Sequence, residues 1–380
     1  MKDETTMKAL LPIRRIVART MAVAAAFIAL CSAAAANYDF DKAWKEVNTF
    51  NSDNLPRSIT NKLDEISREA LAAKRWPHYA HAFIARAEAM KEWVQKEGRV
   101  DWIAELTASV NAQPEPVQAV LQLFLAQMYR DVSSEMEDDE SAIADFEAAA
   151  VSGKIPHLSP ARIDETLDGL FAKVLAREAE LKVQKVDDWR PLLLKDKVSD
   201  SYCPTLFDFA VRDMMEYYEH GEVLDAKLKK ALALYDRQMS FHRGSGNVDA
   251  LAMAELKRAE CIYENSGKPS DERVAEFASF LDGFIARYEG RTSVVAVAAD
   301  EKAHLIKYKK NNGAAAHALA LEYAKKWPGT LGGKICAKTV ADLEEKSLDI
   351  SVERNWCVPS QKIAVEVKNV RETSTSALCL

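Results

Sequence analysis

An eight-residue motif occurs twice in the chain, as FIARYEGR at residues 284–291 and as YAKKWPGT at residues 323–330. The copies lie 39 residues apart, a spacing within the range of two-helix repeats such as the tetratricopeptide and HEAT types. In each copy an aromatic residue closes a run with helical periodicity, and a glycine follows that can take the left-handed conformation after a helix. Two copies of the motif at this spacing predict an array of helical hairpins.

Apolar residues at helical spacing extend this pattern from residue 41 to about residue 345. Pro56 and Pro77 each open such a run, because the first turn of a helix needs no backbone donor. The chain holds only 13 Gly and 12 Pro in 380 residues, which also favours helix. We expect Asn247 and Ser270 to cap two further helices. One run places its apolar residues on a single face that we expect in the core: Tyr79, Phe83, Ala87, Met90 and Val94.

The period changes after residue 346, where apolar and polar residues alternate at residues 348–353 and again at residues 363–368. Such alternation predicts half-buried strands. The expected fold class is therefore mainly α, a tetratricopeptide-like helical-hairpin array (α-solenoid) over residues 37–345. A short β-stranded end, the start of an incomplete β segment, follows over residues 346–380. We expect the chain to be one part of a longer protein, since two strands do not close a stable sheet.

Residues 1–36 are predicted to be a signal peptide. A basic region made of Lys8, Arg14, Arg15 and Arg19 precedes the apolar segment MAVAAAFIAL at residues 21–30, which is too short to span a bilayer. The run from Ala33 to Ala36 supplies the small residues for cleavage. Export to the periplasm, the cell envelope or the medium is the expected localisation. A lipid anchor at Cys31 is the alternative, disfavoured because Leu30 stands where a small residue is expected.

Composition narrows the class of partner. The formal charge is −7, with 29% charged and 48% hydrophobic residues, and an acidic soluble chain of this kind is a poor binder of nucleic acid. Beyond residue 36 no apolar stretch is long enough for a membrane span. Five cysteines remain there, and their spacing favours buried thiols over metal ligands, with a Cys336–Cys357 bridge left open.

No residue is expected to be catalytic, cofactor-binding or metal-ligating. Asp131 and the acidic residues at 135–140 lack the spacing and glycine of a calcium loop, so a solvated acidic loop or helix start is the favoured interpretation. His78 and His81 share a helix face, but two imidazoles do not make a zinc site, and capping or surface roles are favoured. Gly244-Ser245-Gly246 lacks the spacing of a nucleophile elbow. We therefore expect a non-enzyme with no cofactor.

The tryptophans could line a ligand groove, but large aromatic residues at helical spacing more often fill the core between repeats, and that is the favoured interpretation. Any exposed one would be a candidate anchor for a protein partner. They are Trp44, Trp76, Trp93, Trp102, Trp189, Trp327 and Trp356.

Three patches resemble a known family. The segment at residues 323–330 is followed by Cys336, by Val358-Pro359-Ser360 and by residues 363–370 (IAVEVKNV). The opening segments at residues 38–44 (YDFDKAW) and 54–58 (NLPRS), and the segment at residues 204–209 (PTLFDF), agree with it. Together they resemble the N-terminal helical region of large bacterial alpha-2-macroglobulin-like proteins, up to the start of the first macroglobulin β-domain.

The resemblance implies a protease-trapping role for the full-length protein, with this chain as an exported, non-catalytic helical module. Its partner would be a protease or the remaining macroglobulin domains. The family's thioester motif, C-x-E-Q, is absent here, so none of its functional residues carries over. The alternative is a self-standing periplasmic tetratricopeptide-like scaffold that binds a peptide or protein in its groove.

Overall fold

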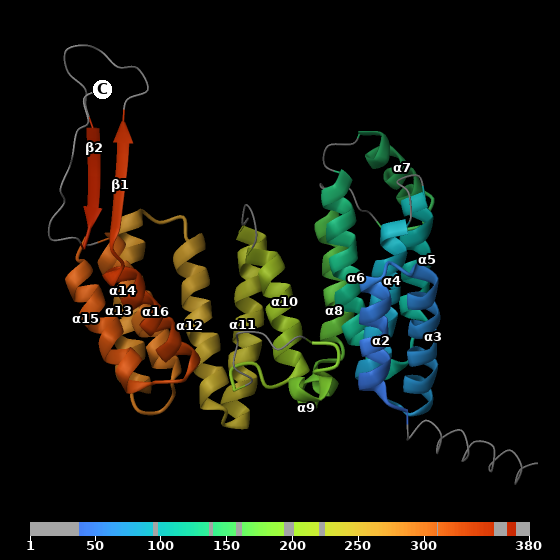
Figure 1. Ribbon diagram of the computed structural model, residues 1–380, viewed down its shortest axis with the longest axis horizontal. Helices are drawn as coiled ribbons and strands as arrows, with labels where there is room; N and C mark the ends of the chain where they lie inside the picture. Colours follow the sequence, from blue (N-terminus) through green and yellow to red (C-terminus); the bar gives the residue numbers. More distant parts are fainter. Residues whose placement is uncertain are drawn as a thin grey trace, which may run out of the picture. The chain divides into compact units, whose positions relative to one another are not determined.

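The computed structural model describes residues 38–93, 98–136, 140–156, 162–193, 201–219, 225–309, 311–352 and 363–369. The predicted signal peptide, Cys31, Trp356, Cys357 and Cys379 lie outside these ranges. The described part of the chain is mainly helical, which confirms the predicted class (Figure 1). None of the described helices is long and apolar enough to cross a bilayer. The described residues divide into two compact units: those within residues 1–195 and 205–213, and those within residues 196–204 and 214–380.

In the first unit, α2 packs on α3, α3 on α4, and α4 and α5 on α6, which also contacts α7 and α8. Figure 1 shows α2 to α6 running alongside one another in this unit. The elements are α2 (Phe40–Ser52), α3 (Pro56–Ala72), α4 (Trp76–Trp93), α5 (Arg99–Asn111), α6 (Glu115–Met136), α7 (Glu140–Val151), α8 (Ile163–Leu175), α9 (Glu178–Val183) and the short 3₁₀ helix η2 (Val186–Trp189).

The core of the first unit lies around α6. Its residues from Leu121 to Ala126 are all buried, with Leu121 and Leu125 fully so. A smaller cluster joins α2, α3 and α4 through Val47, Leu63 and Ile66. Pro56 stands in the first turn of α3, as predicted. A helix buried on most sides, like α6, holds the surrounding helices at fixed positions, and this places the surfaces of α3, α4 and α5.

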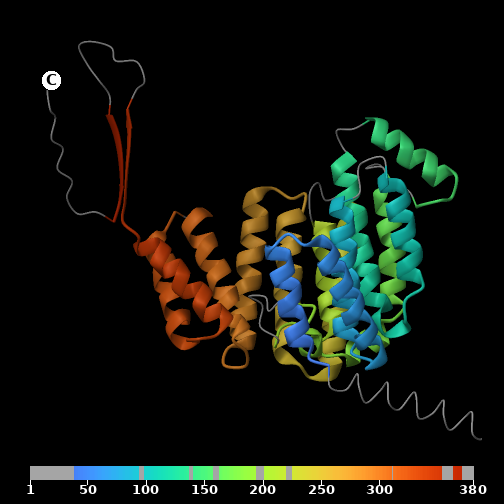
Figure 2. The same ribbon diagram turned by 45° about the vertical axis from the view of Figure 1, so that its right-hand side comes forward.

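The second unit contains the later helices and the strands, and α10 contributes residues to both units. The elements are α10 (Leu206–Glu219), α11 (Asp225–Ser245), α12 (Val248–Asn265), α13 (Ser270–Tyr288), α14 (Val294–Lys309), α15 (Gly313–Lys326), α16 (Leu331–Glu344), β1 (Ser347–Val352) and β2 (Ile363–Lys368). Figure 2 shows α13 to α16, orange to red, packed side by side, and α14 contacts α12, α13, α15 and α16.

Helix α14 is the centre of the second unit, because six consecutive residues, Val294 to Ala299, are buried. Its small side chains let α16 approach closely at Gly332. The repeated motif lies at the ends of α13 and α15, and its glycines take the predicted left-handed conformation, with φ of 69° at Gly290 and 81° at Gly329. The two copies of the motif therefore end in turns in which the glycine has the same backbone conformation.

One of the two predicted helix caps is confirmed. The Asn247 side chain accepts a hydrogen bond from the Ala250 backbone N–H at 3.0 Å at the start of α12. Ser270 does not cap, and that prediction was wrong: it is the first residue of α13, preceded by Pro269, with no side-chain cap. Proline at that position leaves the serine one residue too far into the helix to act as a cap.

After α16 the chain enters two antiparallel strands, with Ser347 opposite Lys368 and Val352 opposite Ile363. The Asn369 side-chain amide donates to the carbonyl oxygens of Leu343 at 2.5 Å and Glu345 at 2.9 Å. These two bonds satisfy carbonyl groups at the C-terminal end of α16 and hold the base of the ribbon against it.

Candidate groove on the first unit

A groove lies between α3, α4 and α5, with a volume of about 570 Å³. That volume falls in the range of about 300–1,000 Å³ typical of ligand pockets. Fourteen residues line it: Asp64, Ser67, Arg68, Leu71, Tyr79, Phe83, Arg86, Ala87, Met90, Trp102, Glu105, Leu106, Ser109 and Gln113.

The floor of the groove is the apolar face of α4 that the sequence placed in the core. Tyr79 and Phe83 are only half-buried, and Met90 is 37% exposed. The prediction of a core face was wrong for these residues and right for Ala87, which is buried although it also lines the groove, while Val94 lies outside the described ranges. On α3, Leu71 is 43% exposed at the edge of the same surface. Large apolar side chains left open to solvent in a concave surface mark a binding site more often than chance exposure does.

The wall on the α5 side contains Trp102 and Leu106, which are almost completely buried. Trp102 therefore fills the core, as favoured for the tryptophans, and adds one apolar edge to the groove. Trp189 is likewise buried, whereas Trp44, Trp76 and Trp327 are half-buried. None of the tryptophans whose side chains the structure describes is exposed, so the exposed anchors of the groove are Leu71 and Met90 instead.

The rim of the groove carries charges of both signs. Asp64 on α3 and Arg86 on α4 form an ion pair at 2.7 Å, each about half exposed. Arg68, on α3, is 70% exposed and makes only a long contact of 3.4 Å with Glu69. Glu105 stands exposed on the α5 side. Exposed pairs of this kind add about 0–1 kcal/mol to stability, so these charges are more useful for orienting a ligand than for holding the fold.

One end of the groove is closed by a hydrogen bond from the Tyr79 hydroxyl to Gln113 Oε1 at 2.5 Å. Burial raises the pKa of Tyr79, so the phenol stays protonated and donates at neutral pH. The amide Nε2 of Gln113 in turn donates to the Ser109 carbonyl at 2.8 Å. This chain of bonds links α4 to the end of α5 and keeps the two walls at their separation.

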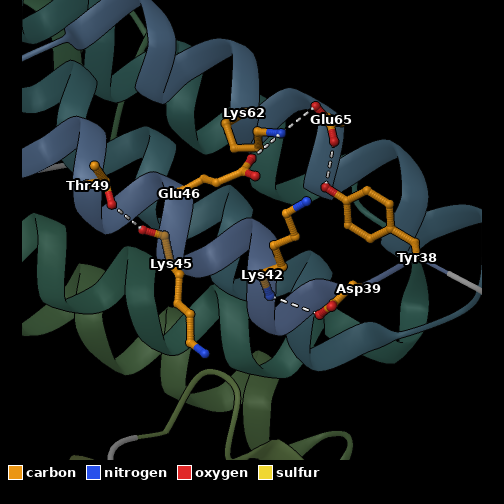
Figure 3. A network of polar contacts seen from close by, with 8 residues as sticks. All are labelled: Tyr38, Asp39, Lys42, Lys45, Glu46, Thr49, Lys62 and Glu65. Carbon is orange, nitrogen blue, oxygen red and sulfur yellow. Dashed lines mark hydrogen bonds and ion pairs between the residues drawn. The ribbon is translucent and has the colours of Figure 1, made fainter.

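The helix that carries one wall is fixed by a polar network on its other side (Figure 3). Tyr38 donates to Glu65 at 2.8 Å, and Lys62 bridges Glu46 of α2 at 2.8 Å and Glu65 at 2.9 Å. Hydrogen bonds from Lys62 and Tyr38 lower the pKa of Glu65, and bonds to Glu46 and Glu65 raise that of Lys62. The network therefore stays charged at neutral pH and ties α2 to α3.

His78 and His81 also position α2, and the prediction of surface or capping roles was wrong. His78 stacks on Phe40 with ring centroids 4.3 Å apart, and His81 stacks on Trp44 at 3.8 Å. The indole Nε1 of Trp44 donates to His78 Nδ1 at 3.1 Å, a bond that requires an unprotonated Nδ1. Burial lowers the pKa of both histidines, that of His81 to about 4. The imidazoles therefore pack as neutral rings between α2 and α4.

The other weighed residues do not form a site in the described part of the chain. Asp131 belongs to helix α6 and pairs with Lys91 at 3.2 Å, so the interpretation as a loop or helix start was wrong for it. Glu140 does stand in the first turn of a helix, α7, and residues 137–139 lie outside the described ranges. Gly244 and Ser245 are the last residues of α11, and Gly246, with φ of 74°, forms the turn that follows. Within the described ranges, no three His, Cys, Asp or Glu side chains are grouped as metal ligands would be.

Cysteines in the second unit behave as small apolar residues. Cys261 and Cys336 are buried, and burial raises the pKa of each thiol to about 12. The Cys336 thiol donates to the Ala296 carbonyl at 3.1 Å, across the contact between α16 and α14. The favoured interpretation as buried hydrophobic residues holds for these two, while Cys203 is half-buried.

Buried carboxyl groups gather around α12 in the same unit. Glu260 Oε2 accepts from Lys257 at 2.5 Å, whereas its buried Oε1 has no hydrogen-bond partner among the described residues. Burial raises the pKa of Glu260 to about 7, despite the opposing effect of Lys257. Glu219 accepts from the Tyr235 hydroxyl at 2.9 Å. These groups are candidates for pH-dependent stability rather than for chemistry.

Comparison with known proteins does not identify the groove. No protein-family model, no curated protein and no solved structure matches the chain.

Proposed function

We propose that this chain is a non-catalytic protein-interaction module whose contact surface includes the groove between α3, α4 and α5. The observation that carries the proposal is the apolar floor from Tyr79 to Met90, open to solvent and bordered by charged residues. Interfaces of this type join an apolar centre to a polar rim. An apolar floor with charges only at its edge suits contact with another molecule's apolar surface, so binding is the chemistry that the groove supports best.

The finer architecture that we propose is a tetratricopeptide-like α-solenoid. Support comes from the repeated motif in the second unit. Arg287 in the first copy pairs with Glu255 at 3.0 Å, and its counterpart 39 residues later, Lys326, pairs with Glu289 at 2.7 Å. In both copies a basic residue near the end of a helix thus reaches a carboxylate that lies earlier in the chain. Repeated contacts between successive units are what a solenoid requires.

We propose two alternative biological roles for this module. The first is an exported module of an alpha-2-macroglobulin-like protein, which serves protease trapping by the full-length protein. It rests on the resemblance of residues 38–44, 204–209 and 323–370, and on the passage from α16 into an antiparallel ribbon at the place where that family begins its first β-domain. The second is a self-standing periplasmic scaffold. Both use the chain as a binding surface.

Site-directed photo-crosslinking in living cells that express the chain tests the interaction proposal. A benzophenone amino acid replaces Met90 in the groove in one variant of the full chain, and Leu55, which is 44% exposed outside it, in another. We expect a discrete protein adduct from position 90 that position 55 does not yield. Identical adduct patterns from both positions would refute a role for the groove.

The identity of the adduct then separates the two settings. A protease, or a polypeptide with macroglobulin β-domains, supports the first proposal, whereas an unrelated periplasmic protein supports the second. The mass of the N-terminus of the exported chain tests the predicted cleavage near Ala36. A chain that retains residues 1–36 in the soluble fraction would contradict the signal peptide.

A further inference from the structure

We infer that the groove between α3, α4 and α5 binds an amphipathic α-helix of about three turns, laid along α4. This inference rests on the proposed function and names the class of its partner. Three observations carry it: the length of the groove, the state of the backbone in its walls, and the arrangement of charge on its rim.

The length of the groove matches a short helix. Its floor runs from Tyr79 to Met90 along α4, and its wall from Trp102 to Ser109 along α5, with Gln113 just beyond the end of that helix. The floor covers 11 residue steps, or about 16 Å at 1.5 Å per residue. A docked helix of about 12 residues covers the same distance, and its side chains at i, i+4, i+7 and i+11 lie on one face.

The backbone of the walls excludes pairing with an extended peptide. The lining residues of α3, α4 and α5 lie inside helices, where N–H and C=O groups are already paired along the helix. An extended peptide would therefore find no strand edge, and its own N–H and C=O groups would lie unpaired over Phe83 and Met90. A helix pairs these groups internally, so it can cover an apolar floor without that cost.

The rim charges give the docked helix a preferred rotation. Arg68 is exposed on the α3 side and Glu105 on the α5 side, whereas Asp64 and Arg86 already neutralise each other. A helix with acidic residues on the flank that faces α3 and basic residues on the flank that faces α5 complements both sides. Charge complementarity of this kind selects orientation more than it adds affinity.

Two libraries of displayed peptides, each screened for binding to the full chain, test the inference. The first varies apolar residues at i, i+4, i+7 and i+11 on an 18-residue helical scaffold, with acidic and basic flanks in both arrangements. The second presents the same residues in extended peptides of alternating pattern. We expect binders from the helical library, circular dichroism of the bound peptide typical of helix, and loss of binding when proline replaces a central residue of the peptide.

Matched variants of the protein locate the site. The double variant Leu71→Gln/Met90→Gln should weaken helix binding by about 30-fold, because each exposed anchor loses an apolar contact. Leu55→Gln, with the same chemistry and exposure outside the groove, should change it less than about twofold. Glu105→Lys should lower affinity for the preferred flank arrangement by about three- to fivefold and favour the reversed one.

The outcomes separate this inference from the function on which it rests. Binders that come only from the extended library and weaken in the double variant would overturn the helical partner but keep the interaction groove. Binders unaffected by the double variant, together with no groove-specific adduct at position 90, would overturn both. The absence of binders from either library would overturn the helical partner.

Discussion

The tight contact between α14 and α16 makes a quantitative prediction for Gly332→Ala. A Cβ atom at Gly332 would lie 2.8 Å from Ala296 Cβ, 2.8 Å from the Val297 backbone nitrogen and 3.0 Å from the Ser293 carbonyl oxygen. Carbon atoms pack best at about 3.5–4.0 Å, so the two helices must separate by several tenths of an ångström to admit the methyl group. Two of the three atoms are backbone and cannot turn aside.

The magnitude follows from a comparison with Gly283→Ala. Gly283 lies inside α13, and a Cβ there would meet nothing within 4 Å. Gly283→Ala, inside its helix, gains about 0.8–1 kcal/mol of helix propensity, and Gly332→Ala, in the first turn of α16, gains less. Only Gly332→Ala also incurs the overpacking cost of about 1–3 kcal/mol. The free energy of unfolding of Gly332→Ala should therefore lie below that of Gly283→Ala by at least about that cost.

Thermal unfolding of the full-length protein, followed by circular dichroism, measures the difference. For a unit of this size 1 kcal/mol corresponds to about 2–4 °C, so Gly332→Ala should melt at least about 2 °C below Gly283→Ala, which itself should match or exceed the unsubstituted protein. Hydrogen exchange should locate the added opening in α14 and α16. If Gly332→Ala proves as stable as Gly283→Ala, the close approach of these helices is wrong.

Three further predictions concern titration and reactivity. The neutral His81 stack on Trp44 contributes stability above the unfolded pKa of about 6.5 and loses it as pH falls toward 4, so Trp44 fluorescence should report loosening of α2 in that window. His78, whose pKa burial also lowers, accepts from the same indole, so His81→Phe should reduce the transition and leave the part that His78 contributes. Glu260 shows the opposite pH dependence, because burial raises the pKa of its carboxyl to about 7. Its contribution to stability is present at acid pH and is lost as pH rises through 7. Glu260→Gln should therefore add about 1 kcal/mol to the free energy of unfolding at pH 8 and little at pH 4, as measured by urea unfolding. A maleimide should label half-buried Cys203 well before Cys336, whose buried thiol has its pKa raised to about 12; equal labelling rates by mass spectrometry would contradict that placement.

Local rules read from the sequence predicted the helical class and several of its boundaries. Pro56 in the first turn of α3, Asn247 as a cap, and Gly290 and Gly329 in left-handed turns each depend on a few neighbouring residues. Such features follow from backbone sterics and nearby hydrogen bonds, which act within a turn or two of the chain. At these four positions the sequence by its local chemistry therefore indicated where a helix begins or ends.

What covers each helix was decided only by the tertiary structure. The periodicity of α4 showed that Tyr79, Phe83 and Met90 share a face, but it carries no information on whether another helix fills the space above them. The positions of α3 and α5 leave that space open, and a predicted core face becomes the floor of a groove. His78 and His81 of the same helix were predicted at the surface or in caps, yet α2 covers them. Hydrophobic pattern reports only that a face benefits from burial, whereas the neighbour that buries it depends on contacts distant in sequence.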